Sequence, residues 1–334
     1  MPSDGAAPAA GHPPPRPLVP ARVSAFLSIL AMAGALGLFL PKALVAQEGG
    51  WDPTCPASLG AECIRAEALG RAALAGVGLA QAGPGALVGS ASTLGRRFGT
   101  TPRVALSVRG GVTRFPWPDF AASPAGTRNS SVGSLHGSIV VGLFDGFSPQ
   151  PTVGGLLGLD LLLTGDWVFL PDGDGFDASG AAWGYGVRLG VLRESFSLPG
   201  ITLSGIRRHG GDIGLLPPNV GGGVSLEDPV TTSLRGEIGK EFWGIGFLVG
   251  AGWDRYEADA EVVSGGASEP GPTWTDLDAD RALFFAGISR TFVVWQLSAE
   301  FGWAEGVGGG SMELPGYDGE EGTVFGTLAL RLTL

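Results

Sequence analysis

The sequence is short of charge, and above all of positive charge. Only 16% of the 334 residues are charged, against roughly 25% in ordinary soluble domains. Lysine and arginine together number 21, the formal net charge is −11, and no run of basic residues occurs. Because phosphate binding needs clustered Lys and Arg, these shortages exclude nucleic acid as a partner.

What the chain has in abundance is glycine, at 59 residues, within a hydrophobic fraction of 44%. The glycines follow no Gly-X-Y period, which excludes collagen. The apolar residues come in short bursts instead of long tracts. A glycine-rich, charge-poor chain of this kind predicts an all-β protein with tightly curving strands.

The first 46 residues have the features of an export signal. Residues 1–22 are rich in proline, an uncharged apolar run follows from Val23 to Leu40, and small residues lead to Ala46. This pattern predicts a signal peptide cleaved after Ala46. The alternative is a single spanning helix, since eighteen apolar residues are just enough to cross a bilayer. We favour the signal because nothing later resembles a cytoplasmic domain.

Cysteine is almost absent: Cys55 and Cys63 are the only two. Both lie after the expected cleavage site, and export to an oxidising compartment favours a disulfide between them. A zinc site is disfavoured because two cysteines with no histidine nearby supply too few ligands.

From Arg103 to Leu334 apolar residues alternate with small or polar ones. In segment 181–192, for example, Trp183, Tyr185 and Val187 alternate with glycines and Arg188. Period-two alternation is typical of a strand with two unlike faces. The segments with this pattern are 103–113, 135–144, 153–163, 181–192, 201–208, 230–238, 244–253, 282–289, 295–301 and 323–334.

The breaks between these segments alternate between long and short. They are 114–134, 145–152, 164–180, 193–200, 209–229, 239–244, 254–281, 290–293 and 303–322. A soluble secreted sandwich, the alternative fold, has no reason to collect every long loop at one end. A transmembrane barrel has short periplasmic turns and long outward loops. The sequence therefore predicts an up-and-down antiparallel transmembrane β-barrel of ten strands with both termini in the periplasm.

Aromatic residues gather near the ends of the predicted strands. Rings with a polar edge favour the membrane–water interface, so this placement fits a bilayer crossing. The residues are Trp117, Trp167, Phe169, Trp243, Trp253, Tyr256 and Trp303.

Over residues 103–334 the sequence resembles bacterial outer-membrane β-barrel proteins of the small OmpA-like class. The terminal strand Thr323–Leu334 is similar to the strand that this family's assembly machinery recognises, although it ends on leucine instead of an aromatic residue. The resemblance implies an outer-membrane location, contact with membrane lipid and lipopolysaccharide, and insertion by the barrel assembly machinery. It carries over no functional residues, because this scaffold hosts adhesins, channels and enzymes.

Residues 47–102 form a leader that contains a short helix. Helical spacing begins near Ser58, Glu67 and Arg71 are placed to form an i,i+4 pair, and Gly76 and Gly78 are expected to end the helix. Such a leader could plug the barrel, cover its periplasmic mouth or remain flexible. We expect a loosely packed periplasmic leader.

If the apolar face of each strand meets lipid, the opposite face puts charged residues inside the barrel. Five cations and four anions nearly cancel, which predicts a network of ion pairs in a narrow lumen instead of a filter of one sign. The expected residues are Arg109, Asp160, Arg188, Arg208, Arg235, Glu237, Asp254, Glu300 and Arg331.

The outward loops hold most of the acidic residues. Among them Asp172, Asp174 and Asp177 form a D-G-D-G-F-D cluster. Carboxylates separated by glycines suit calcium, which takes six to eight oxygen ligands from a flexible chain, although the glutamate expected at the twelfth position is missing. The cluster is thus a candidate calcium loop, with an ordinary solvated loop as the alternative. No other cofactor is expected.

Histidine limits the chemistry that the chain can perform. Of three histidines only His136 and His209 follow the signal, and no G-x-S-x-G or phosphate-binding glycine loop occurs. We therefore expect a non-enzymatic barrel, either a narrow passive channel or a structural and surface-interaction protein. The alternative is a hydrolase that uses His209, beside Asp212, at the extracellular rim, with lumenal His136 as a second candidate.

Overall fold

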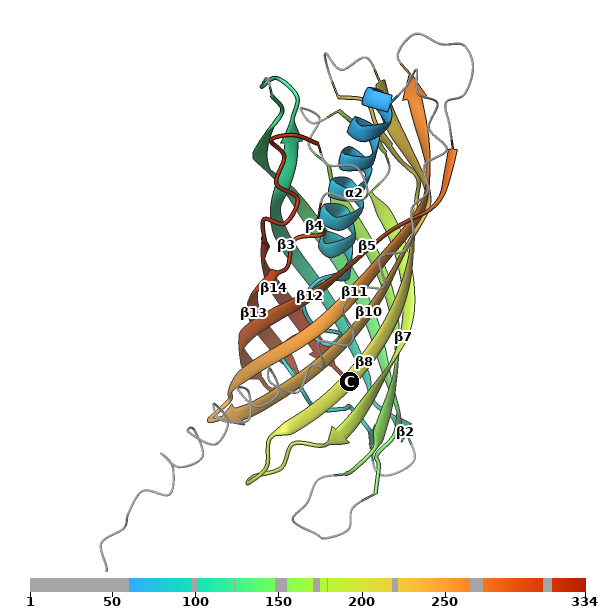
Figure 1. Ribbon diagram of the computed structural model, residues 1–334. Coiled ribbons are helices and arrows are strands. Elements are labelled where there is room, and N and C mark those ends of the chain that lie inside the picture. Colours follow the sequence, from blue (N-terminus) through green and yellow to red (C-terminus); the bar gives the residue numbers. More distant parts are fainter. Residues whose placement is uncertain are drawn as a thin grey trace, which may run out of the picture. The chain divides into compact units, whose positions relative to one another are not determined.

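Ten antiparallel strands close into a barrel in the computed structural model (Figure 1). Each strand pairs with the next along the chain, and the first pairs with the last, which confirms the predicted topology and strand number. The strands are β3 (Val104–Asp119), β4 (Gly126–Phe144), β5 (Gly158–Phe169), β7 (Ala181–Leu192), β8 (Gly200–Gly210), β10 (Gly222–Phe242), β11 (Ile245–Ser264), β12 (Thr273–Phe292), β13 (Trp295–Ala304) and β14 (Thr323–Thr333).

The structure describes most of the chain from Gly60 onward, and these residues belong to one unit, residues 45–334. The described ranges are 60–97, 101–122, 124–147, 155–170, 175–178, 180–217, 222–264, 273–308 and 314–334. Besides the barrel strands they include helix α2 (Gly60–Ala82), the ribbon of β1 (Arg96–Arg97) and β2 (Thr101–Pro102), and two short strands, β6 (Phe176–Ala178) and β9 (Ile213–Leu215). Within these ranges no helix is both long and apolar enough to cross a bilayer.

The connections separate into two ends of the barrel. At one end, which we call the short-turn end, consecutive strands are connected by residues 145–157, 193–199, 243–244 and 293–294. The other, the long-loop end, has residues 120–125, 170–180, 211–221, 265–272 and 305–322. The C-terminus lies at the short-turn end, where the Leu334 N–H donates to the Val104 carbonyl at 2.8 Å. In Figure 1 the long-loop end is at the top.

The outer surface of the barrel wall is apolar. The large side chains predicted to meet lipid are exposed on it, among them Val112 at 59%, Leu163 at 58% and Leu328 at 66%. A contiguous exposed apolar surface of this extent would be unstable in water and needs a lipid environment. The period-two alternation therefore has the physical cause that the sequence indicated.

Several strands continue beyond the predicted boundaries. Near the long-loop end their apolar residues face inward and their polar residues face outward, so the pattern expected for a lipid-facing strand did not identify these strand ends. On β11, Tyr256, Ala258 and Ala260 are buried inside, while the neighbouring Asp259 is exposed. The predicted loops 114–134, 209–229 and 254–281 are thus in large part strand. Because of the same inversion, two aromatic residues that were predicted to lie at the membrane–water interface lie inside the barrel instead. Trp117 and Tyr256 are buried inside, at 1% and 0% exposure, whereas Trp167, Phe169, Trp243 and Trp303 are exposed.

Helix α2 lies inside the long-loop half of the barrel (Figure 1). It packs in a core with Phe115, Trp117 and Tyr256, and 17 of its 23 residues are buried. Residues 60–95 therefore fill the barrel, and the expected loosely packed leader is not what the described residues form. The predicted pair between Glu67 and Arg71 is present at 3.2 Å.

The helix also runs past the two glycines that were expected to end it. A Cβ at Gly76 would overlap the ring of Phe115, and one at Gly78 would overlap the ring of Tyr256. Glycine is present there because the helix and the wall approach so closely. The helix ends at Ala82 and is followed by Gly83, whose φ of +63° favours glycine and whose N–H donates to the Leu79 carbonyl.

Candidate functional site

The charged interior of the barrel is the candidate site, together with the segment that fills it. We call α2 and residues 83–95 the plug. The structure places all nine predicted charged residues on the inner face, eight of them buried and Arg331 half-buried. Their positions follow from the strand register, because inward residues alternate with the lipid-facing ones along every strand.

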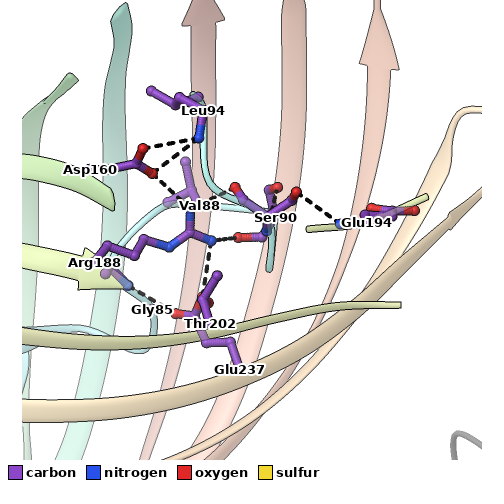
Figure 2. Close-up of polar contacts among 12 residues, drawn as sticks. Gly85, Val88, Ser90, Leu94, Asp160, Arg188, Glu194, Thr202 and Glu237 are labelled. Atoms are coloured by element: carbon purple, nitrogen blue, oxygen red, sulfur yellow. Dashed lines mark hydrogen bonds and ion pairs between the residues drawn. The ribbon is translucent and has the colours of Figure 1, made fainter. Parts of the chain in front are cut away.

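Arg188, on β7, joins two carboxylates to the plug (Figure 2). Its guanidinium lies 3.6 Å from Asp160 and 3.5 Å from Glu237. It also donates to the carbonyls of Ser90 and Ser92 of the plug. A single fully buried cation thus neutralises two anions and binds the plug at once.

Two neighbouring arginines work in the same way. Arg235 pairs with Asp254 at 2.6 Å and donates to the Pro84 carbonyl at 2.7 Å. Arg208 lies 3.4 Å from Asp166 and donates to the Ala82 carbonyl at 3.1 Å. Each side chain therefore joins the barrel wall to the last residue of α2 or to the plug residues directly after the helix.

Other lumenal charges have main-chain partners in the plug. Arg109 donates to the Gly85 carbonyl and Arg331 to the Val88 carbonyl, both at 3.0 Å. Among the described residues neither guanidinium forms an ion pair with a carboxylate. Glu300 accepts the N–H of Gly89 at 3.1 Å. The lumenal charged residues therefore form two kinds of interaction: ion pairs within the wall and charge-assisted hydrogen bonds to the plug.

Sequence reasoning missed three members of this network. Asp166 and Arg281 were assigned to loops and Tyr256 to the interface, but all three are buried inside. The Tyr256 hydroxyl donates to Asp254 at 2.9 Å and accepts from Arg281 at 3.0 Å. The continuing period of two, read with inverted polarity, is the signal that would have placed them.

A serine, a histidine and an aspartate form a hydrogen-bonded series on the inner wall. His136 Nδ1 lies 2.8 Å from Asp166 Oδ1, and His136 Nε2 lies 3.0 Å from Ser134 Oγ. The order matches that of a hydrolytic triad. The adjacent cavity is lined by His136, Asp166, Arg109 and Arg208 with plug residues, and Ser134 does not line it. All three groups are at least 94% buried, so the arrangement leaves the serine without an approach for substrate.

The predicted catalytic pair at the rim does not form in the described part of the chain. His209 lies on the outer face of β8, stacked on Trp183 with the ring centroids 5.1 Å apart. Asp212 instead accepts the N–H of Asp228 at 3.1 Å. His209 therefore lies against Trp183, and the alternative in which it pairs with Asp212 is not what the described residues form.

Two further predictions fall outside the described residues. Asp172 and Asp174 are not described, nor is the side chain of Asp177, and the described residues contain no group that could hold a metal. Cys63 is fully buried at the start of α2, but Cys55 is not described. The calcium loop and the disulfide stay predictions.

A closed barrel with an apolar outer face and a charged lumen has the architecture of a transmembrane β-barrel, which is the fold that the sequence resemblance implied. No protein-family model matches the chain, and no curated protein sequence matches it.

Solved outer-membrane barrels are similar to this chain in fold. For Ail, the attachment invasion locus protein of Yersinia pestis, the identity is 8% and the TM-score 0.29, covering 70% of this chain and 99% of Ail. For the translocator domain of the autotransporter NalP from Neisseria meningitidis the values are 10%, 0.38, 70% and 88%. For the outer membrane protease OmpT from Escherichia coli they are 8%, 0.28, 70% and 96%. Similarity at this level carries no argument about function.

Proposed function

We propose that the chain is a non-enzymatic outer-membrane barrel, exported by a cleaved signal, whose lumen is closed by its own plug. It acts through the surface of its long-loop end instead of passing solutes. The observation that supports this function is the set of hydrogen bonds from lumenal arginines of several wall strands to the plug main chain, among them Arg109 on β3, Arg188 on β7 and Arg235 on β10.

The alternative of a narrow passive channel finds less support. Inward glycines could have left a water path, but the space beside Gly184 is occupied by Arg208, and that beside Gly250 by Phe285. Helix α2 packs against the inner wall in the long-loop half of the barrel. A ten-stranded barrel is only a little wider than the eight-stranded barrels that side chains alone can fill.

Conductance of the purified, full-length protein in a planar lipid bilayer tests this proposal. We expect no stable conductance in salt solution, because eight of the nine predicted lumenal charged residues are buried and the arginines among them bind plug carbonyls. Steady, porin-like current from freshly inserted protein would overturn the closed-barrel proposal and assign a channel function instead.

A second candidate function rests on the geometry of Ser134, His136 and Asp166. In this proposal Ser134 is the nucleophile of a hydrolase, His136 its general base and Asp166 the group that orients the histidine. A fluorophosphonate probe that modifies activated serines tests it directly. Labelling that is lost in both Ser134→Ala and His136→Ala would favour the hydrolase. No labelling of the folded protein, which we expect, would identify the series as structural.

A further inference from the structure

The plug has a direction along the barrel axis. A Cβ added at Gly70, in α2, would meet the side chains of Leu226 and Leu277. Leu226 lies near the start of β10, at the long-loop end. At the other extreme, a Cβ added at Gly95 would meet Asp145 and Arg193, which directly follow β4 and β7 at the short-turn end. The chain therefore travels from the long-loop end to the short-turn end between these two glycines.

The carbonyl groups of the plug show that this passage is a single one. Arginines of the wall bind them along the length of the plug, from Arg281 at Ala75, in the long-loop half of β12, to Arg193 at Leu94, directly after β7 at the short-turn end. The pairs are Ala75 with Arg281, Ala82 with Arg208, Gly83 and Pro84 with Arg235, Gly85 with Arg109, Val88 with Arg331, Ser90 and Ser92 with Arg188, and Leu94 with Arg193.

The amino end of α2 consequently lies at the long-loop mouth. Ala61 and Arg65 are exposed there, whereas Cys63 and Leu69 are fully buried. After Leu94 the chain enters β1, and β3 then begins at the short-turn end with Val104. The first described residue, Gly60, and the C-terminus thus lie at opposite ends of the barrel axis.

In transmembrane barrels the long loops face outward and the short turns face the periplasm. We propose that the exported chain crosses the outer membrane once through its own lumen before the first barrel strand. The residues that precede Gly60 are then displayed on the outer surface of the cell. This placement differs from the expectation that both termini are periplasmic, and it adds the N-terminal end to the surface that the acidic loops offer to partners.

Single cysteines and a membrane-impermeant maleimide test this placement. In a Cys55→Ser, Cys63→Ser background, the test variant is Ala61→Cys. The outer control is Ala122→Cys, exposed in the loop between β3 and β4. The periplasmic control is Phe196→Cys, whose side chain is 100% exposed in the turn between β7 and β8.

On intact cells we expect the test variant to label as fully as the outer control, and the periplasmic control to label only after the outer membrane is permeabilised. Labelling of Ala61→Cys only after permeabilisation would overturn the proposal while leaving the barrel topology intact. If both controls label only after permeabilisation, the outer-membrane orientation itself is wrong, and the proposal fails with it.

A second measurement retains the native cysteines, because their replacement could impair folding. A short epitope tag is inserted between Gly49 and Gly50, and the same tag between Trp243 and Gly244 serves as the periplasmic control. Antibody should bind intact cells that carry the first tag and not those that carry the second. Binding to the first tag only in permeabilised cells, with equal amounts of folded protein, would contradict the proposal.

Discussion

Arg235 donates to both carboxylate oxygens of Asp254, at 2.6 and 3.0 Å, from one barrel strand to the next. The same guanidinium reaches the carbonyls of Gly83 and Pro84, at 3.1 and 2.7 Å. Both side chains are at least 96% buried. This pair therefore connects β10, β11 and the plug, and its loss would affect the wall and the closure of the lumen together.

Replacing Arg235 by alanine should destabilise the barrel strongly. The change leaves the Asp254 carboxylate buried without its ion-pair partner, at a cost of about 3–5 kcal/mol in the free energy of unfolding. The matched control is Arg207→Ala, at an exposed outward position on β8. The temperature at which the folded form disappears on SDS gels should fall for Arg235→Ala and stay near wild type for Arg207→Ala. Equal values for the two variants would contradict the buried-pair argument.

The same Arg235→Ala variant should raise conductance in planar bilayers. Two of the hydrogen bonds that hold the plug are lost, so the seal between the plug and β10 is weaker. Arg207→Ala again serves as the control, because its side chain lies outside the lumen. Unchanged baseline current in both variants would mean that these hydrogen bonds do not maintain the closure.

A methyl group added at Gly78 should destabilise the protein, although alanine ordinarily stabilises a helix over glycine by about 0.5–1 kcal/mol. Here the new Cβ overlaps the ring of Tyr256, and overpacking of a core typically costs about 1–3 kcal/mol. Gly60→Ala, with no atom within 4 Å of its Cβ, is the control in the same helix. Urea unfolding should show a lower midpoint for Gly78→Ala only. A higher midpoint for that variant would show that the helix is not held tightly in the barrel.

The exported protein should begin at Gln47. An apolar run followed by small residues at Ala46 predicts cleavage there. Intact-mass measurement of protein purified from the outer membrane checks the site. A mass that includes residues 23–40 would instead support the spanning-helix alternative.

Cys55 and Cys63 should form a disulfide in the exported protein. The compartment is oxidising, and the two residues are the only cysteines of the chain. A maleimide reagent added to the unreduced, unfolded protein should therefore find no thiol, and should find two after reduction. Two reactive thiols before reduction would refute the pairing.

Much of the barrel wall could be predicted from the sequence because each strand meets lipid on one face. Leu161, Leu163 and Leu328 alternate with inward residues, and this pattern needs no knowledge of the neighbouring strands. The strand ends could not be predicted in the same way, because there the environment outside the wall changes from lipid to water. Beyond that level residues such as Tyr256 face inward and Asp259 outward, so a rule that expects apolar residues outside assigns these strand ends to loops.

The sequence by itself determined the strand number and the inward positions of Arg109, Arg188 and Arg235. Only the tertiary structure decided what those side chains bind. Their partners include carbonyl groups of residues 82–92, and main-chain oxygens have no sequence signature because every residue carries one. Helix α2 was equally hard to place, since a helix enclosed on all sides shows no apolar stripe that would point to its surroundings.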